Sequence, residues 1–254
     1  MYNKRQQYII ELIDKKGEVQ LHELKDIFPD VSMMTLRRDL ISFEKNRLVI
    51  RTYGGAVSVK KVPNVSGEEN PYNLRESENV EAKIEISKKA LEFVERGRSI
   101  YFDAGSTIMY LAEKLPDDNY SIVTSGINVG LELMKKAKPS VIILGGLVNR
   151  NTFSVSGFNT INFLEFINID LAFMSASAFS IEKGFTISNI YECELKRKII
   201  ENAKKIIVLM DSSKINKNLP FTFAKLEDID IWICEKKLPS DIMATAKKNN
   251  VQLI

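Results

Sequence analysis

The run Val31-Ser32-Met33-Met34-Thr35-Leu36-Arg37-Arg38-Asp39-Leu40 decides the architecture of the first part of the chain. Ser32 carries a hydroxyl group of the kind that caps the first turn of a helix. Leu36, Leu40 and Phe43 recur at helical spacing behind it, which predicts a helix with one apolar side. The remaining residues of the run are hydroxyl-bearing or charged, so the other side of this helix is expected to face a polar partner or solvent.

Two helices are expected before this run and a hairpin after it. Apolar spacing predicts a first helix over residues 8–13, ended by Gly17, and a second over residues 21–28, ended by Pro29. Residues 48–57 are typical of two short strands around a turn. Three helices followed by a hairpin make a winged helix-turn-helix domain, in which the second helix of the motif enters the DNA major groove.

The third helix and the hairpin carry residue types that contact DNA bases and phosphates. The predicted DNA-binding residues are Ser32, Met33, Thr35, Arg37, Arg38, Lys45, Arg47, Arg51 and Tyr53. The alternative interpretation is a small helical domain whose basic side is merely solvated. The charge distribution favours DNA, because residues 1–60 carry the whole formal excess of +3 whereas residues 61–254 are neutral. The expected partner is double-stranded operator DNA.

Composition excludes several other classes of protein. With 44% hydrophobic and 27% charged residues, and no apolar run of the roughly 18–20 residues that a membrane span needs, we expect no membrane segment. The polar N-terminus does not resemble a signal peptide, so a cytoplasmic location is expected. Cys193 and Cys234 lack metal-ligand spacing, and the single histidine, His22, cannot form a paired-histidine zinc site. We therefore predict no metal and no cofactor.

Residues 79–254 are expected to form a second domain, separated from residues 1–57 by an exposed linker over 58–78. Short apolar runs alternate with helical patterns, which predicts an α/β fold with a mainly parallel sheet. Their continuous hydrophobicity indicates strands that are buried on both faces. The expected strands span residues 99–102, 121–123, 141–144, 171–174, 206–209 and 231–233.

Polar and glycine-containing segments follow five of these strands. Ligands of parallel sheets bind beyond the carboxyl ends of the strands, so these segments are expected to converge. A glycine followed by hydroxyl residues at a helix start suits a phosphate group, and Lys214 adds positive charge. The predicted effector-binding residues here are Asp103, Gly105, Ser106, Thr107, Thr124, Ser125, Gly145, Gly146, Ser175, Asp211 and Lys214. Helix caps and turns are the alternative explanation for each segment taken singly.

The first domain resembles the DeoR family of transcriptional regulators. Members usually have Thr-Ile-Arg-Arg-Asp-Leu, then Leu-Glu and then His-Gly-Gly-Ala, where this chain has Leu36, Phe43 and Tyr53 in place of the isoleucine, leucine and histidine. The resemblance implies a repressor of a carbohydrate operon.

The resemblance extends to a sensor domain that is similar in fold to ribose-5-phosphate isomerase. It implies that a phosphorylated sugar binds with its phosphate near residues 105–107 and Thr124, and it adds Glu194 and Lys196 to the site, from the segment that also holds Glu192. The matching sensor segments are Asp103 to Thr107, Thr124-Ser125, Gly145-Gly146, Ser154 to Gly157, Asp170 to Phe173 and Asp211 to Lys214. Ser175 and Ala178 replace frequent glycines and Ser125 a frequent asparagine, so the pocket is expected to be reshaped.

Two further functions compete with an effector-responsive regulator. An active sugar-phosphate isomerase would need a general base, for which Glu192, Glu194, Asp170 and Lys214 are candidates. No isomerase-type glycine-rich loop accompanies Lys196, so we predict no enzymatic activity. A constitutive DNA-binding protein whose α/β domain only oligomerises would have an apolar strand-end crevice. In either regulator, a homo-oligomer, dimer or tetramer, is expected because paired DNA-binding domains gain avidity.

Overall fold

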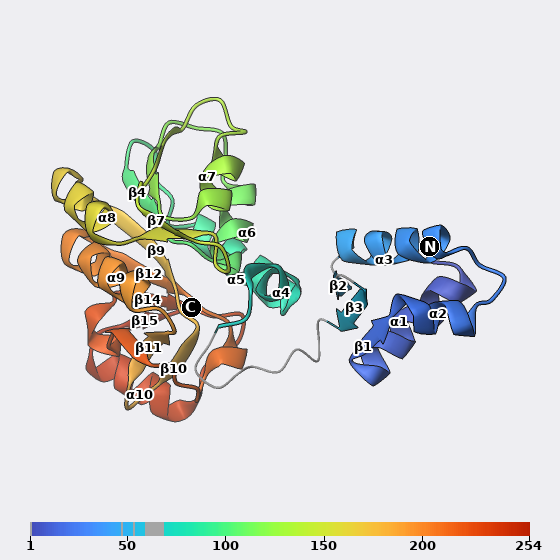
Figure 1. The fold of residues 1–254 in the computed structure, drawn as a ribbon. Helices are drawn as coiled ribbons and strands as arrows, with labels where there is room; N and C mark the ends of the chain where they lie inside the picture. Colours follow the sequence, from blue (N-terminus) through green and yellow to red (C-terminus); the bar gives the residue numbers. More distant parts are fainter. Residues whose placement is uncertain (1, 47, 53, 59–68) are drawn as a thin grey trace. The chain divides into compact units, whose positions relative to one another are not determined.

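The computed structural model describes residues 2–46, 48–52, 54–58 and 69–254 (Figure 1). The chain divides into two compact units. Met1–Val65 and Asn73–Glu78 form the first unit, and Ser66–Tyr72 and Asn79–Ile254 form the second. No helix in the described ranges is both long and apolar enough to cross a bilayer.

The first unit contains the three expected helices and the expected hairpin. Asn3 caps the first helix by accepting a hydrogen bond from the N–H of Gln6, and Gly17, at a φ of 95°, ends it. The elements are α1 (Lys4–Lys16), β1 (Glu18–Gln20), α2 (Leu21–Ile27), α3 (Met33–Lys45), β2 (Val49–Arg51) and β3 (Gly55–Ser58). Strand β1 was not predicted, because three residues become a strand only through pairing with β3.

The segment between the predicted domains differs from the expected linker over residues 58–78. It contains the helix α4 (Tyr72–Ser77), in which Leu74 is buried. The glycine and prolines that indicated a linker all precede this helix in the chain.

A seven-stranded sheet forms the centre of the second unit, and every neighbouring pair within it is parallel. Its order is β15 (Gln252–Leu253), β14 (Ile231–Ile233), β12 (Ile206–Leu209), β9 (Leu171–Ser175), β4 (Ser99–Phe102), β5 (Ser121–Thr124) and β6 (Ser140–Ile143). The predicted α/β fold with a mostly parallel sheet is confirmed. Only the last strand was missed, since its two residues carry no periodic signal.

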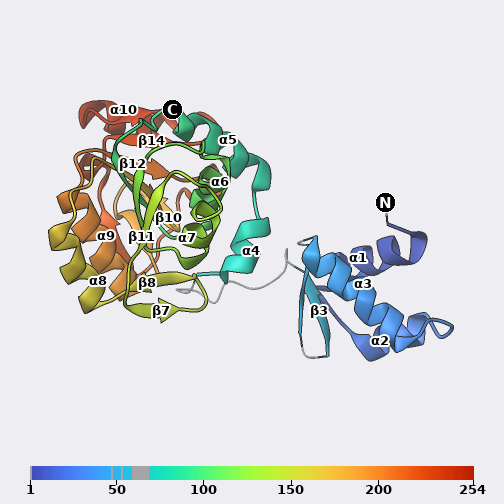
Figure 2. The ribbon, with the colours of Figure 1, turned by 90° about the horizontal axis from the view of Figure 1, so that it is seen from above.

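Successive residues of these strands enter two different cores, as continuous hydrophobicity predicts. In β12, Val208 packs into one core and Leu209 into the other, and both are fully buried. Helices α5 (Val80–Leu91), α6 (Ser106–Lys114) and α7 (Ile127–Leu133) cover the face of Leu209. Figures 1 and 2 show α6 and α9 on opposite sides of the sheet.

The face of Val208 is covered by helices and by a second, antiparallel sheet. The elements are α9 (Ile190–Asn202), α10 (Ser240–Lys248), β10 (Ala178–Ser180), β11 (Gly184–Ile187) and β13 (Phe221–Ala224). The remaining elements are the hairpin β7 (Leu147–Asn149) and β8 (Ser154–Ser156), α8 (Phe158–Phe163), and the 3₁₀ turns η1 (Leu164–Phe166), η2 (Ser212–Lys214) and η3 (Leu226–Asp228). Because the sheet is parallel, the loops after β4, β5, β9 and β12 all leave from one edge, which we call the carboxyl edge.

Candidate functional site

The start of α3 presents its polar residues outward. Ser32 caps the helix, accepting a hydrogen bond from the N–H of Thr35 at 3.1 Å. Ser32, Met33, Arg37 and Arg38 are exposed, and Thr35 is partly exposed. Neither arginine has an ion-pair partner in the described part of the chain. Both guanidinium groups are therefore available to an external anion.

Asp39 faces the opposite way from the two arginines before it. Its side chain is buried and accepts hydrogen bonds from Arg5 Nε at 2.9 Å and from Gln6 Nε2 at 2.8 Å. These bonds attach α3 to the first turn of α1, while Leu36 and Phe43 fill the core beneath. Asp39 thus sets the position of the helix, and the arginines on its outer side are held in place indirectly.

The predicted residues of the hairpin are only partly within the described chain. Arg51 is exposed on β2, and its Nε donates to Glu44 Oε2 at 2.8 Å, which attaches the strand to α3. Arg47 and Tyr53, and the side chain of Lys45, lie outside the described residues. Their assignment to the DNA-binding surface stays a prediction.

The carboxyl edge of the large sheet holds a buried ion pair. Lys196 on α9 donates to Asp103, which follows β4, and both side chains are at most 5% exposed. The same carboxylate oxygen accepts from the N–H and the hydroxyl of Ser175 at 2.8 and 2.9 Å. Lys196 Nζ also donates to the carbonyl of Ser175 at 3.0 Å. The predicted residues Asp103, Ser175 and Lys196 are thus brought together. The charges of Asp103 and Lys196 neutralise each other.

Gly105 sits directly against this cluster at the start of α6. A Cβ atom there would lie 2.7 Å from the Ser175 hydroxyl oxygen, so a side chain would push the Ser175 side chain away from its present position. Ser106 and Thr107, the first two residues of α6, are buried. The Thr107 hydroxyl has no hydrogen-bond partner within the described part of the chain. The backbone N–H groups of this first turn point to the carboxyl edge, as an anion site requires.

Thr124 and Ser125, two predicted effector-binding residues at the end of β5, form hydrogen bonds within the protein. The Ser125 hydroxyl lies 2.7 Å from the Tyr101 hydroxyl, and Thr124 Oγ1 accepts from the N–H of Gly126 at 3.0 Å. Burial, followed by the charge of Asp103, raises the pKa of Tyr101 well above its ordinary value. Tyr101 therefore stays protonated and can hold Ser125 in place.

A buried carboxylate lies one helical turn before Lys196, but it belongs to Glu192 and not to the predicted Glu194. Glu192 accepts hydrogen bonds from Thr152 at 2.8 Å and Ser154 at 2.5 Å. Glu194 is exposed. Residues four apart share a helix face whereas residues two apart do not, so Glu192 is the acidic residue that accompanies Lys196. The i, i+4 spacing is the sequence signal that would have identified it.

Two further predicted segments, Asp211 to Lys214 and Gly145–Gly146, differ in what they contact. Lys214 Nζ donates to the carbonyl of Ala176 at 3.0 Å and lies 3.9 Å from Asp211 Oδ2, so the loop after β12 joins the loop after β9. Gly146, by contrast, packs where a Cβ would overlap Thr160, whose hydroxyl donates to the Gly145 carbonyl at 2.7 Å. The Gly145–Gly146 turn is therefore attached to α8 rather than to the Asp103 cluster.

Unsatisfied polar atoms mark the same edge. Among the described residues, the buried side-chain atoms that lack a hydrogen-bond partner belong to Thr107, Asn128 and Asp211. Thr107 and Asn128 lie in the first turns of α6 and α7, and Asp211 lies two residues after the end of β12. A buried polar group without a partner costs free energy, so such groups are rare in a folded protein unless a ligand, water or ion satisfies them.

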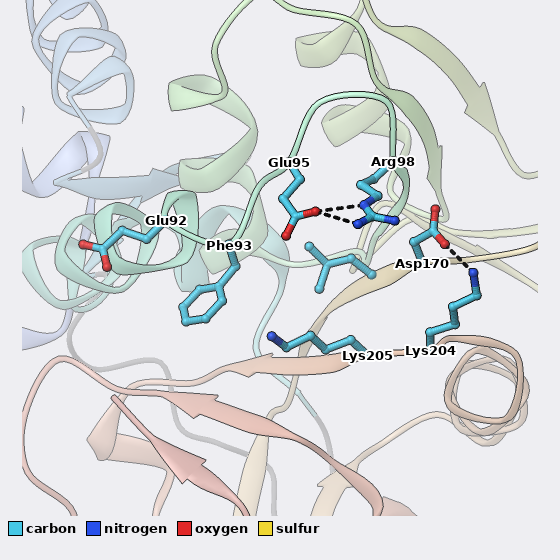
Figure 3. Close-up of a pocket in the computed structure, with 8 residues that line it drawn as sticks. Glu92, Phe93, Glu95, Arg98, Asp170, Lys204 and Lys205 are labelled. Carbon is cyan, nitrogen blue, oxygen red and sulfur yellow. Dashed lines mark hydrogen bonds and ion pairs between the residues drawn. The ribbon is translucent and has the colours of Figure 1, made fainter.

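A cleft of about 280 Å³ opens at the other, amino edge of the sheet (Figure 3). Four of its charged residues form two ion pairs: Lys204 donates to Asp170 at 2.8 Å, and Arg98 donates to Glu95 at 2.9 Å. Glu92 and Lys205 also line the cleft, and Lys205 Nζ lies 5.1 Å from the centre of the Phe93 ring. Asp170 also accepts from the N–H of Ser99 at 3.1 Å. Because the carboxyl edge holds buried polar atoms without a hydrogen-bond partner and this cleft holds none, the carboxyl edge is the stronger candidate for a ligand among the described residues.

Comparison with known proteins identifies both domains. Residues 5–62 match the DeoR-like helix-turn-helix domain, and residues 78–236 match the DeoR C terminal sensor domain. The chain is 35% identical to the HTH-type transcriptional regulator GolR of Listeria innocua, over 92% of this chain and 91% of that protein. It is 28% identical to the glycerol-3-phosphate regulon repressor of Escherichia coli, over 98% and 97%.

Among solved structures, ribose 5-phosphate isomerase A of Methanocaldococcus jannaschii is similar at a TM-score of 0.41 and 17% identity, over 54% of this chain and 55% of that one. The family matches cover most of the chain and agree with the two units of the fold. This chain belongs to the DeoR family of helix-turn-helix transcriptional regulators.

Proposed function

We propose that the protein is a repressor of a carbohydrate operon whose affinity for operator DNA is controlled by a phosphorylated sugar bound at the carboxyl edge of the second unit. The observation that carries this proposal is the gathering of the unsatisfied buried polar atoms of Thr107, Asn128 and Asp211 at this edge. A ligand rich in hydroxyl and phosphate oxygens would satisfy both donors and acceptors there. An apolar crevice, which a purely oligomerising domain would have, is not what these residues provide.

The charges around the edge favour an anion. The first turn of α6 contributes N–H groups and the positive end of the helix dipole. Lys214 adds a positive charge that is 19% exposed at its side chain. Asp211 Oδ2 is suited to accept a hydrogen bond from a sugar hydroxyl. A phosphate at α6 with hydroxyls towards Asp211 is the orientation that this chemistry supports.

The loops of the edge also hold the chain that leads to the DNA-binding domain. The hydroxyl of Ser177, two residues beyond β9, donates to Glu69. The N–H of Tyr72 donates to the Asn151 carbonyl at 2.7 Å, and its ring meets that of Phe153. We call residues 69–72 and 79 the connecting segment.

The connecting segment is also attached to the loop after β12. Asn79 Nδ2 donates to Ser213 Oγ at 2.9 Å and to Asp211 Oδ1 at 3.3 Å. Asp211 therefore has one oxygen on the connecting segment and the other unsatisfied at the ligand edge. A ligand that engages Asp211 or Lys214 changes the free energy of this attachment, which is the differential interaction that effector control requires.

Titration of an operator complex tests the proposal. Glycerol 3-phosphate, ribose 5-phosphate, fructose 6-phosphate and related phosphosugars are added to protein bound to fluorescent operator DNA, and anisotropy is recorded. One of them is expected to change operator affinity and to stabilise the protein, by about 2.7 kcal/mol at 100 times its dissociation constant. Their unphosphorylated counterparts serve as controls. Operator affinity that responds to none of the phosphosugars contradicts effector control.

A homo-oligomer is part of the proposal. Large apolar side chains stay exposed on α8 and η1, where Phe158 is 77% and Phe166 82% exposed. A second copy would remove these rings from water, and paired DNA-binding domains would then read paired half-sites. Sedimentation of the full chain is expected to give at least a dimer. A monomer that persists with and without operator DNA would refute it.

We further propose that the protein does not catalyse sugar isomerisation. Asp170, one candidate for the general base, precedes β9, whereas Lys214 meets the edge beyond it. The five residues of β9 separate them by roughly 16 Å at about 3.3 Å per residue. Glu194 is exposed on α9, and Glu192 is occupied by three neutral hydrogen-bond donors. Turnover of ribose 5-phosphate by the purified protein would contradict this.

A further inference from the structure

Asn128 was not among the residues that the sequence indicated, yet its environment is unusual. It lies in the first turn of α7, and both Oδ1 and Nδ2 of its amide are buried without a hydrogen-bond partner. A primary amide offers two donor hydrogens and a two-lone-pair acceptor, and no side chain or backbone group in the described ranges uses this capacity. Leucine, of similar size, would fill such a position at lower free energy in the absence of a ligand.

The topology places Asn128 beside the proposed phosphate site. Helix α6 follows β4 and α7 follows β5, and these strands are neighbours with Phe102 opposite Thr124. The two helices pack against each other, and a Cβ on Gly126 would lie 3.2 Å from the Cα of Ala104, so their leading loops touch. Thr107 and Asn128 therefore occupy equivalent first-turn positions on adjacent helices, and both have unsatisfied polar atoms.

We propose that Asn128 is a ligand-binding residue, which extends the effector site from α6 to α7. Its Nδ2 group donates to a phosphate oxygen of the effector, next to the donor of the Thr107 hydroxyl, and its Oδ1 accepts from the nearest sugar hydroxyl. This inference rests on the proposed function, because the ligand is the same phosphorylated sugar. No protein group of the described chain satisfies the amide, and the bound effector does.

If Asn128 binds the ligand, replacing it should lower the affinity for the effector without lowering the stability of the ligand-free protein. Asn128→Leu removes two buried unsatisfied atoms, so the midpoint of thermal unfolding without ligand should be unchanged or higher than in the wild type. The same variant should bind the effector about tenfold more weakly or worse, since it loses its hydrogen bonds to the ligand. Asn128→Asp keeps the size of the side chain but adds a negative charge, and it should weaken binding further by repelling the phosphate.

The experiment compares wild type, Asn128→Leu, Asn128→Asp and Asn119→Ala as full-length proteins. Asn119 is exposed in the loop before β5, so its replacement should change neither quantity. Thermal unfolding is measured without ligand, and calorimetric titration is performed with inorganic phosphate, glycerol 3-phosphate, ribose 5-phosphate and fructose 6-phosphate. Asn128→Asp provides the affinity comparison if Asn128→Leu does not fold.

The outcomes distinguish the two proposals. Wild type that binds a phosphosugar, with Asn128 variants that bind it equally well, overturns the role of Asn128 and leaves the proposed function intact. A ligand-free Asn128→Leu protein that folds but melts well below wild type also overturns it, because the amide would then be satisfied in the unliganded state. Wild type that binds none of the four probes overturns both proposals.

Discussion

Arg37, Arg38 and Asp39 are consecutive, yet they have different roles. Both arginines are exposed on α3 and Asp39 is buried against α1. Arg37→Ala or Arg38→Ala should therefore weaken operator binding by about 1–3 kcal/mol for a base contact, or flatten the salt dependence by about one unit for a phosphate contact. The unfolding midpoint should stay at the wild-type value. Binding is measured by anisotropy at several salt concentrations.

Lys248→Ala is the matched control, because Lys248 is an exposed cation on α10 of the second unit. If both arginine variants bind operator as tightly as Lys248→Ala does, α3 is not the helix that reads DNA.

Unlike the exposed arginines of α3, Lys196 and Asp103 are buried and form an ion pair with each other. Lys196→Met leaves the Asp103 carboxylate buried without its cation, which should lower the free energy of unfolding by about 3–5 kcal/mol. Lys196→Met with Asp103→Asn removes both charges and should recover much of this loss. Urea unfolding measures both variants. If Lys196→Met alone is as stable as wild type, the ion pair does not stabilise the carboxyl edge.

At the scale of elements, Asp170 links the amino ends of β9 and β4. The hydrogen bond from Lys204, and then that from the N–H of Ser99, hold the pKa of Asp170 below its ordinary value. A lowered pKa means that the carboxylate stabilises the fold above its unfolded-state pKa, and that this contribution is lost as pH falls through the folded-state pKa. Asp170→Asn should therefore cost most near neutral pH, by at most about 1 kcal/mol for a partly exposed pair.

Urea unfolding checks this linkage. The free energy of unfolding of wild type and of Asp170→Asn is measured at pH 7 and then at decreasing pH values down to below about 4. The difference in unfolding free energy should shrink towards acid. A difference that is constant or grows with acid would contradict the assigned cause.

At the scale of the whole molecule, the connecting segment determines whether ligand binding reaches the operator. Asn79 has a φ of 50°, a conformation that glycine adopts readily, so Asn79→Gly keeps the backbone and removes the attachment to Asp211 and Ser213. The variant should still bind the phosphosugar, within about threefold of wild type, while the ratio of operator affinities with and without effector falls towards one. Calorimetry and operator anisotropy measure the two quantities.

Asn250→Gly is a close control, because Asn250 has a φ of 58° and is exposed after α10, away from the carboxyl edge. It should show the wild-type response to effector. An Asn79→Gly protein with that same response would mean that coupling does not pass through this attachment.

The sequence by itself determined the three helices and hairpin of the first domain and six of the seven parallel strands, because apolar spacing and continuous apolar runs are local signals. It also located most of the candidate edge, since the residues after parallel strands must meet on one side. It missed β1 and β15, whose few residues become strands only through their partners. It also missed the short antiparallel strands β7, β8, β10, β11 and β13.

Only the tertiary structure decided which polar side chains are occupied and which are free. The family resemblance indicated Glu194, but packing of α9 buries Glu192 and exposes Glu194. Asp103 and Ser125 are bonded within the protein, whereas Thr107, Asp211 and the unforeseen Asn128 keep unsatisfied atoms. Hydrogen-bond satisfaction depends on neighbours that are distant in the chain, and no local pattern records it.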